Sequence, residues 1–415
     1  MSYCCDSANV IHVSKSGDDA NGGIAQQYPV SLADDAKLTI AGAIAVASNG
    51  DTIIVWPGEY DEQVDLSGKT AVTLSGSGWG SKIVNTQAAA GVLLLGDYCK
   101  ISNIWVENDY GVTSVDGYNG IVGAAKAGVR IENSYVKANG DVIKLSECDG
   151  SFIKNCIIVG GEYGIALVNT AVAKKTIIEN CHINVDLWVK CNSAAIYVSG
   201  GRTIIRNCTA YADMTSSNAS HQVIGLYING ISISTFVEVF NSIFYATSDS
   251  GTYQYGLYSL GAYAKVLAHT SIIQAAGSGD DDYSIINNPT LVSDIKISKC
   301  SYGTTSGVIT RLDAALDANA RVDIGAIGGA AQSLTDLKDF VDNGYDPSTH
   351  YIKDVATVKD ILEGDEAIDT DATPFQRVVT NKTTAAELIR KDLKDIDGNS
   401  ISNINTVIGS MEEPA

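Results

Sequence analysis

The sequence predicts an all-β protein folded as a right-handed parallel β-helix of about nine or ten coils. Two internal repeats and the short distance between them carry this prediction. The first repeat has the form Ile-x-Asn-Cys/Ser-x-Ile, and its asparagine recurs at intervals of 30, 22, 25, 27 and 34 residues. The asparagines are Asn103, Asn133, Asn155, Asn180, Asn207 and Asn241. Such intervals are typical of a chain built from stacked structural units.

The second repeat is an apolar-x-apolar segment that precedes each copy of the first, such as Ile196-Tyr197-Val198 ahead of Asn207. Alternating apolar and β-branched residues indicate short strands. The connection between the two repeats is too short to hold a crossover helix. Each coil therefore contains at least two strands and pairs with the next coil, as in a solenoid.

Each asparagine marks a tight corner, because asparagine tolerates left-handed backbone angles. A small residue follows it, which indicates an inward column with little room. That column consists of Ser134, Cys156, Cys181, Cys208 and Ser242, with Thr270 and Cys300 in degenerate copies. The column accounts for four of the nine cysteines, which we expect to be reduced and buried. Cys4 and Cys5 lie outside it, and their role stays open between metal ligation and cross-linking. No metal site and no cofactor are predicted.

The repeats divide the chain into three parts. Residues 1–50 form an expected N-terminal cap with a helix from Leu32 to Ala47, ended by Gly50. A cap is expected because the open end of a β-helix exposes unpaired strand edges. Residues 51–310 hold the parallel β-helix. Residues 311–415 lose the repeat and are expected to form a small α/β region for capping or assembly.

The charge of the chain excludes some classes of binding partner. The chain has 48 acidic and 28 basic residues and a formal net charge of −20. Strong negative charge disfavours nucleic acid and anionic membranes as partners. The first ten residues lack the basic and apolar regions of a Sec signal peptide. We therefore expect a virion or an extracellular surface, reached without a Sec signal, and a homo-oligomer or other virion proteins as partners.

Several segments resemble the opening of β-helix proteins of the pectin lyase-like superfamily. They are His12–Asp18, Gly50–Val55, Pro57–Tyr60 and Val72–Gly76, and Leu312–Gly328 is similar to the motif that often ends such helices. The resemblance implies the fold. The superfamily includes pectate lyases, pectin methylesterases, polygalacturonases, phage tailspikes and purely structural proteins, so it leaves the activity open.

No catalytic motif of these enzymes is complete in the chain. Gly58–Glu62 resembles a stretch of pectin methylesterases, but their catalytic glutamine, paired aspartates and Arg-Pro-Trp have no match. Polygalacturonase motifs are represented only by two isolated Asn-x-Asp matches. Arg130, Arg202 and Arg206 lack the acidic cluster of a calcium-dependent lyase. Glycoside hydrolysis needs two carboxylates about 5–9.5 Å apart, and we place the candidate aspartates in loops between coils: Asp109, Asp116, Asp186, Asp213, Asp249 and Asp281.

The middle residue of each apolar-x-apolar strand is expected to face outward. In successive coils these residues are Leu93, Val122, Lys144, Ala166, Tyr197, Tyr227, Tyr258 and Ile286. Strands of neighbouring coils lie about 4.8 Å apart, so the three tyrosines should stack. The candidate binding or interface residues are Tyr197, Tyr227, Tyr258, Lys144 and Val122. An exposed apolar stripe of this kind indicates a subunit interface, a surface covered by the chain itself, or a carbohydrate platform. Trp105 and Trp188 are interpreted as isolated packing or loop residues.

Two functions follow from these observations. The first is a structural or adhesive protein, a phage virion component such as a tail spike or fibre that assembles with itself and binds host polysaccharide. The alternative is a polysaccharide lyase or glycoside hydrolase with its site in the edge loops of the β-helix.

Overall fold

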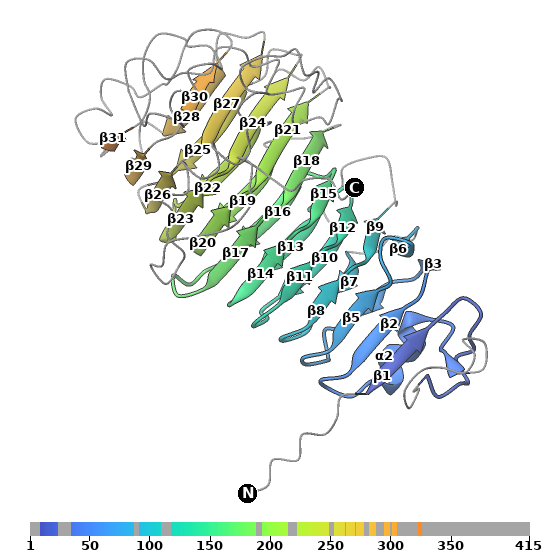
Figure 1. The fold of residues 1–415 in the computed structure, drawn as a ribbon. Coiled ribbons are helices and arrows are strands. Elements are labelled where there is room, and N and C mark those ends of the chain that lie inside the picture. Colours follow the sequence, from blue (N-terminus) through green and yellow to red (C-terminus); the bar gives the residue numbers. More distant parts are fainter. Residues whose placement is uncertain are drawn as a thin grey trace, which may run out of the picture. The chain divides into compact units, whose positions relative to one another are not determined.

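The computed structural model describes residues 9–23, 35–86, 91–108, 118–187, 193–214, 222–248, 253–261, 263–269, 271–277, 282–287, 294–298, 301–304 and 323–325. The chain forms two compact units, Met1–Gly161 and Glu162–Ala415. In both units the described strands belong to three parallel sheets, named A, B and C (Figure 1).

Unit 1 contains one described helix and three sheets. The helix is α2 (Ile40–Val46). Sheet A has the described strands β1 (Val10–Val13), β2 (Thr52–Val55), β5 (Thr73–Gly76), β8 (Lys100–Ser102), β11 (Arg130–Glu132) and β14 (Ser151–Lys154). Sheet B has β3 (Gly58–Asp61), β6 (Ser81–Asn85), β9 (Trp105–Asn108), β12 (Tyr135–Lys137) and β15 (Ile157–Val159). Sheet C has β4 (Val64–Asp65), β7 (Gly91–Leu94), β10 (Asn119–Ala124) and β13 (Ile143–Ser146).

Unit 2 repeats the same order of sheets. Sheet A has the described strands β17 (Lys175–Glu179), β20 (Gly201–Arg206), β23 (Thr235–Phe240), β26 (Ala264–His269), β29 (Asp294–Ser298) and β31 (Asp323–Gly325). Sheet B has β18 (His182–Leu187), β21 (Thr209–Met214), β24 (Ile243–Ser248), β27 (Ile272–Gly277) and β30 (Ser301–Thr304). Sheet C has β16 (Tyr163–Val168), β19 (Ser193–Ser199), β22 (Gln222–Asn229), β25 (Tyr253–Leu260) and β28 (Asp282–Asn287).

Each coil contributes one strand to each sheet and pairs with the equivalent strands of its neighbours. Among the described residues sheets B and C have ten and nine strands, which agrees with the predicted nine or ten coils, and sheet A has twelve because β1 and β31 add one strand at each end. Parallel crossovers within one sheet are almost always right-handed. The predicted fold class, a right-handed parallel β-helix, is therefore confirmed.

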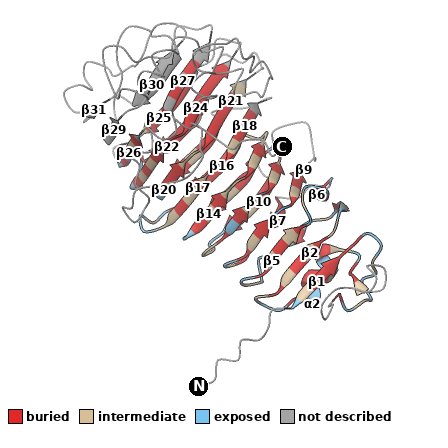
Figure 2. Ribbon diagram, in the orientation of Figure 1, coloured by how far each residue is buried: buried red, intermediate tan, exposed pale blue. Residues whose placement is uncertain are grey.

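Inward residues of the three sheets form the core of each coil. Buried and partly exposed residues alternate along the strands (Figure 2), as in β14 with its buried Ser151 and Ile153. Isoleucines stack at equivalent positions in successive coils, for example Ile101, Ile131 and Ile153 in unit 1, and all three are fully buried. Burying each such side chain stabilises the fold by roughly 1.5–3 kcal/mol.

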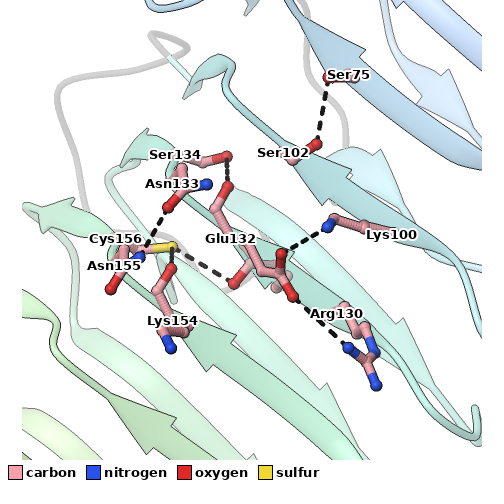
Figure 3. Close-up of polar contacts among 11 residues, drawn as sticks. Ser75, Lys100, Ser102, Arg130, Glu132, Asn133, Ser134, Lys154, Asn155 and Cys156 are labelled. Atoms are coloured by element: carbon pink, nitrogen blue, oxygen red, sulfur yellow. Dashed lines mark hydrogen bonds and ion pairs between the residues drawn. The ribbon is translucent and has the colours of Figure 1, made fainter.

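The asparagine corner joins sheet A to sheet B. All six asparagines of the repeat have positive φ, between 47° and 54°. In unit 1 the Asn155 amide donates to Asn133 Oδ1 at 2.9 Å (Figure 3). In unit 2 Asn241 donates to Asn207 at 2.8 Å. The predicted alignment of the asparagines at one corner is thus observed within each unit.

The small column that follows the asparagines is fully buried, and it includes Cys156, Cys181 and Cys208. These three cysteines are reduced, as expected, and so are the buried Cys99 and Cys148. The thiol of Cys156 donates to the Lys154 carbonyl oxygen at 3.2 Å. Cys4, Cys5, Thr270 and Cys300 lie outside the described residues.

The N-terminal cap differs in detail from the expectation. The described helix begins at Ile40, after the N-cap Thr39, rather than at Leu32, and it ends at Val46, one residue before the expected Ala47. Its first N–H groups are satisfied by carboxylates from elsewhere, because Ile40 and Ala41 both donate to Glu62 at 2.9 and 2.8 Å. This helix-capping contact explains the acidic end of the Gly58–Glu62 motif without catalysis. Strand β1 pairs with β2, so β-helix pairing already begins inside the segment expected to be a cap.

Most of the expected C-terminal region lies outside the described residues. This includes the expected terminal motif at Leu312–Gly328, apart from β31. The domain boundaries at 50 and 310 therefore stay predictions.

Candidate functional site

The three predicted tyrosines stack on the outer face of sheet C in unit 2, and a fourth joins them. Strand register aligns Tyr197, Tyr227 and Tyr258 on β19, β22 and β25. Adjacent ring centroids lie 5.1 Å and 5.2 Å apart. Tyr163 of β16 packs against this row from the side, because register pairs it with Ala194, and its ring lies 4.8 Å from that of Tyr197. We call these four residues the tyrosine ladder.

The ladder is less exposed than the sequence indicated. Tyr227 retains only 7% of its surface, and Ala166, which precedes Tyr197 in the row, retains 1%. Burial in this apolar setting, together with the neighbouring Tyr197 and Tyr258, raises the pKa of Tyr227 far above its usual value. Tyr197 and Tyr258 are half-buried, so the outer parts of these two side chains remain available.

In each of these strands two consecutive residues face inward, which breaks the usual alternation. A second outward row therefore lies beside the ladder. This row contains Tyr163, Ala194, Ile224 and Tyr255. Ala194, Ile224, Tyr227 and Tyr255 form a buried apolar cluster on the outer face of the sheet. The ladder therefore belongs to a small apolar core outside the main one. The Asn229 amide donates to the Tyr197 hydroxyl at 3.1 Å and fixes one edge of it.

Val122 and Lys144, the other predicted site residues, lie in unit 1. Register pairs them on β10 and β13, and both side chains are half-buried. The Lys144 ammonium forms an ion pair with Asp141 at 2.7 Å. The preceding residue in this row is Leu94, whereas Leu93 is fully buried. The prediction of an outward Leu93 is wrong, since a shift of one residue turns a strand residue to the other face.

A second surface, which the sequence interpretation missed, lies on the outer face of sheet B in unit 1. Here Trp105 and Tyr135 are neighbours on β9 and β12, with ring centroids 4.1 Å apart. The Lys82 ammonium lies 5.3 Å from the centre of the Trp105 ring. We call the following residues the Trp105 cluster: Trp79, Lys82, Trp105, Glu107, Tyr135 and Lys137.

Glu107 organises the polar part of the Trp105 cluster. Its carboxylate accepts from the ammonium groups of Lys82 and Lys137, each at 2.9 Å, and from the Trp105 indole N–H at 3.1 Å. Burial alone would raise the pKa of Glu107, but the hydrogen bonds from the two lysines hold it below its usual value. The hydrogen bond to Glu107 raises the pKa of Lys82. Both shifts favour the charged forms of Glu107 and Lys82.

Trp79 provides the open aromatic surface of the cluster. It retains 40% of its surface and lies with its ring centroid 6.0 Å from that of Tyr135. The two ammonium groups are also accessible, since the Lys82 and Lys137 side chains retain 30% and 44% of their surface. The result is an exposed indole beside oriented donors and one carboxylate acceptor.

The asparagine repeat contained the signal for this cluster. The residue two positions after each asparagine faces outward on sheet B, which gives Trp105, Tyr135 and Ile157 in successive coils of unit 1. The residue four positions after it gives Glu107 and Lys137. Trp105 is therefore not an isolated aromatic, and its interpretation as one is wrong. Trp188 lies outside the described residues.

The candidate catalytic residues are placed differently from the expectation. Asp186 and Asp213 lie in strands β18 and β21, in register, rather than in loops. The Tyr211 hydroxyl donates to Asp213 at 2.9 Å. The other four candidate aspartates lie outside the described residues. Arg130, Arg202 and Arg206 each form an ion pair with a glutamate on sheet A, and the contact of Arg130 with Glu132 is drawn in Figure 3.

Within the described ranges, no group of three or more His, Cys, Asp and Glu side chains is arranged to hold a metal ion. No helix in the described part of the chain has the length and apolar character needed to span a membrane.

Comparison with known proteins gives structural neighbours only. No protein-family model and no curated protein sequence matches the chain. Pectin methylesterase PemA from Erwinia chrysanthemi is 14% identical, with a TM-score of 0.41 over 61% of this chain and 89% of that one. Pectate lyase Pel9A is 12% identical, with a TM-score of 0.48 over 83% and 88%. The A-module of the mannuronan C-5 epimerase AlgE6 from Azotobacter vinelandii is 14% identical, with a TM-score of 0.35 over 65% and 93%.

The TM-scores of these three neighbours all lie below 0.5. At such identities and TM-scores they say nothing about the chemistry of this chain. The fold assignment itself rests on the strand pairing, and function has to be inferred from the two outer faces.

Proposed function

We propose that this β-helix binds a polysaccharide, and that the Trp105 cluster of unit 1 is its sugar-binding surface. The observation that carries the proposal is the exposed Trp79 indole beside Lys82, Lys137 and the Glu107 carboxylate they share. An exposed aromatic ring beside fixed polar groups offers one ligand both an apolar face and hydrogen-bonding partners.

The chemistry of the cluster suits a sugar ring. One face of a pyranose carries C–H groups that pack on an aromatic ring, while its rim carries hydroxyl groups. Trp79 supplies the apolar contact. Lys82 and Lys137 supply charged donors, and Glu107 supplies a charged acceptor, so the hydrogen bonds to hydroxyls are of the stronger, charge-assisted kind. Because Glu107 also binds Trp105, the polar groups are held in position before the sugar arrives.

Glycan binding is supported in either of two roles, adhesion or catalysis. For the enzymatic alternative, the described strands place Asp186 and Asp213 at neighbouring backbone positions of β18 and β21. No contact in the described residues favours a tail spike or fibre. That role, and the expected place on a virion or an extracellular surface, stay predictions.

A glycan array probed with the full-length labelled protein tests the proposal. The best oligosaccharide is then titrated calorimetrically against the wild type, Trp79→Ala and Glu107→Gln. We expect each substitution to weaken binding at least about tenfold, corresponding to the loss of roughly 1.4 kcal/mol. Tyr98→Ala is the matched control, because Tyr98 is another exposed aromatic of unit 1, 60% exposed, outside the cluster.

Wild-type affinity in both cluster variants, or the absence of any bound glycan, would contradict the proposal. Incubating the bound oligosaccharide with the protein then separates the two roles. New reducing ends or unsaturated products that disappear in Asp213→Asn would indicate an enzyme. An unchanged oligosaccharide would indicate a binding protein.

A further inference from the structure

We infer that the tyrosine ladder of unit 2 is a self-association surface, and that its partner is a second copy of this chain. The inference is independent of the sugar-binding proposal, because it rests on a different unit and on different residues.

The first support is the absence of charge around the ladder. Three outward rows cross β16, β19, β22 and β25 and contain the following twelve residues: Tyr163, Ala194, Ile224, Tyr255, Ala166, Tyr197, Tyr227, Tyr258, Val168, Ser199, Asn229 and Leu260. None of them is acidic or basic. Two copies with a net charge of −20 repel each other over most orientations. A charge-free face is where two such copies can approach at the lowest electrostatic cost.

The second support is exposed apolar side chains at the ends of the same strands. Val172 follows β16, Ile231 follows β22 and Tyr263 follows β25, with 57%, 43% and 55% of their surface exposed. Tyr253, at the start of β25, is 39% exposed. Exposed apolar side chains thus occur close in sequence to the strands of the ladder, and exposed apolar surface is typical of protein interfaces. Tyrosine is also enriched at interfaces, where its ring is buried and its hydroxyl finds a partner.

The third support identifies the partner. The rings of Tyr197, Tyr227 and Tyr258, which are in register, repeat at 5.1 and 5.2 Å, close to the spacing of the coils. A partner whose own side chains repeat at the same interval stays in contact along the whole ladder, whereas an irregular surface matches it at one coil only. A second copy of this chain has the same repeat because its coils have the same spacing. Symmetric pairing of identical faces also closes the contact and hides it from further addition.

Sedimentation velocity of the full-length protein over a range of concentrations and salt tests this inference. We expect a dimer or a larger closed assembly that becomes more populated at high salt, because salt screens the repulsion between the acidic copies. Tyr258→Glu places a charge on the half-buried part of the ladder and should shift the species to monomer. Ile231→Glu should weaken association as well, and circular dichroism of this exposed-site variant should match the wild type, which separates lost association from misfolding.

Tyr98→Glu is the control, since it adds the same charge at an exposed tyrosine of unit 1. It should assemble as the wild type does. A wild type that stays monomeric under all conditions overturns the inference. So do folded Tyr258→Glu and Ile231→Glu variants that assemble normally. A monomer that loses polysaccharide binding on Tyr258→Glu would assign the ladder to a glycan instead, and the calorimetric result at Trp79 would be unaffected by either outcome.

Discussion

The outer face of sheet B in unit 1 and the outer face of sheet C in unit 2 are organised by opposite means. In the Trp105 cluster two ammonium groups and an indole N–H converge on Glu107 at 2.9–3.1 Å. In the tyrosine ladder the contacts run from ring to ring, and the surrounding rows carry no charge. The same coil repeat therefore supports a polar, oriented surface in one unit and an apolar, stacked surface in the other.

The difference between the two faces shows which positions of a β-helix can vary without affecting the fold. The inward positions are fixed by the core and the asparagine corner, so both units look alike there. The outward positions face only the equivalent residues of the next coil. A row can thus be charged or apolar without disturbing the fold, which makes the outer rows the place where function differs.

The largest expected effect is the loss of a ladder ring. Tyr227→Ala removes a nearly buried ring from between Tyr197 and Tyr258, and large-to-small changes of buried aromatics cost about 3–5 kcal/mol. Urea denaturation should show this loss, and hydrogen exchange should place it in β22 and its neighbours. Tyr98→Ala, at an exposed site, should change stability by less than about 0.5 kcal/mol. Equal effects at the two positions would mean that the ladder contributes no packing.

A smaller effect is expected at the centre of the charged surface. Glu107→Gln keeps the shape but removes the charge that holds Lys82 and Lys137, and hydrogen bonds to charged groups contribute about 1.5–3 kcal/mol. The loss should shrink in high salt, because the lysines are partly exposed and screened. The Tyr227→Ala effect should not shrink with salt. A salt-independent Glu107→Gln effect would contradict the electrostatic account of the cluster.

The two faces show how far the sequence could take the prediction. The ladder was predictable because the repeat fixes which residues of successive coils are neighbours, and Tyr197, Tyr227 and Tyr258 share one position in it. Its burial was not predictable, because the second row beside it arises from two consecutive inward residues in each strand, which break strict alternation. The wrong assignment of Leu93 to the outer face has a related cause. Val92, Leu93 and Leu94 are all apolar, so the sequence does not indicate which of them faces inward.

The Trp105 cluster was missed for a different reason. Trp105 and Tyr135 stand at one position of the repeat and were predictable, but Trp79 precedes β6, outside the repeated motif. That Glu107 accepts from both lysines depends on side-chain conformations that no spacing reveals. Asp186 and Asp213 were placed in loops because the strands of unit 2 extend further past the corner than those of unit 1.

The two faces should also lose their contributions to stability at opposite ends of the pH scale, the Trp105 cluster in acid and the tyrosine ladder in alkali. The pKa of Glu107 is lower in the folded chain, so its contribution to stability is present above the unfolded value near 4.3 and is lost as the pH falls. The pKa of Tyr227 is raised, so its contribution is present below the unfolded value of about 10 and is lost as the pH rises. Hydrogen exchange of β9 and β22 across the pH range measures both. Glu107→Gln should remove the acid dependence at β9, and Tyr227→Phe the alkaline dependence at β22; unchanged profiles would contradict the assignment.

The smallest expected effect tests whether the units differ only in their outer faces. Asn133 and Asn207 each accept the amide of the next asparagine in the column, at 2.9 and 2.8 Å. Both have φ near 50°, which glycine adopts without strain, so Asn133→Gly and Asn207→Gly remove the hydrogen bond alone. Each should cost about 0.5–1.5 kcal/mol, measured by denaturation of the two variants side by side. Since the corner is the same in both units, the two losses should agree. Clearly unequal losses would show that the asparagine corner itself differs between the units, and that the contrast between the charged and the apolar face is not confined to the surface.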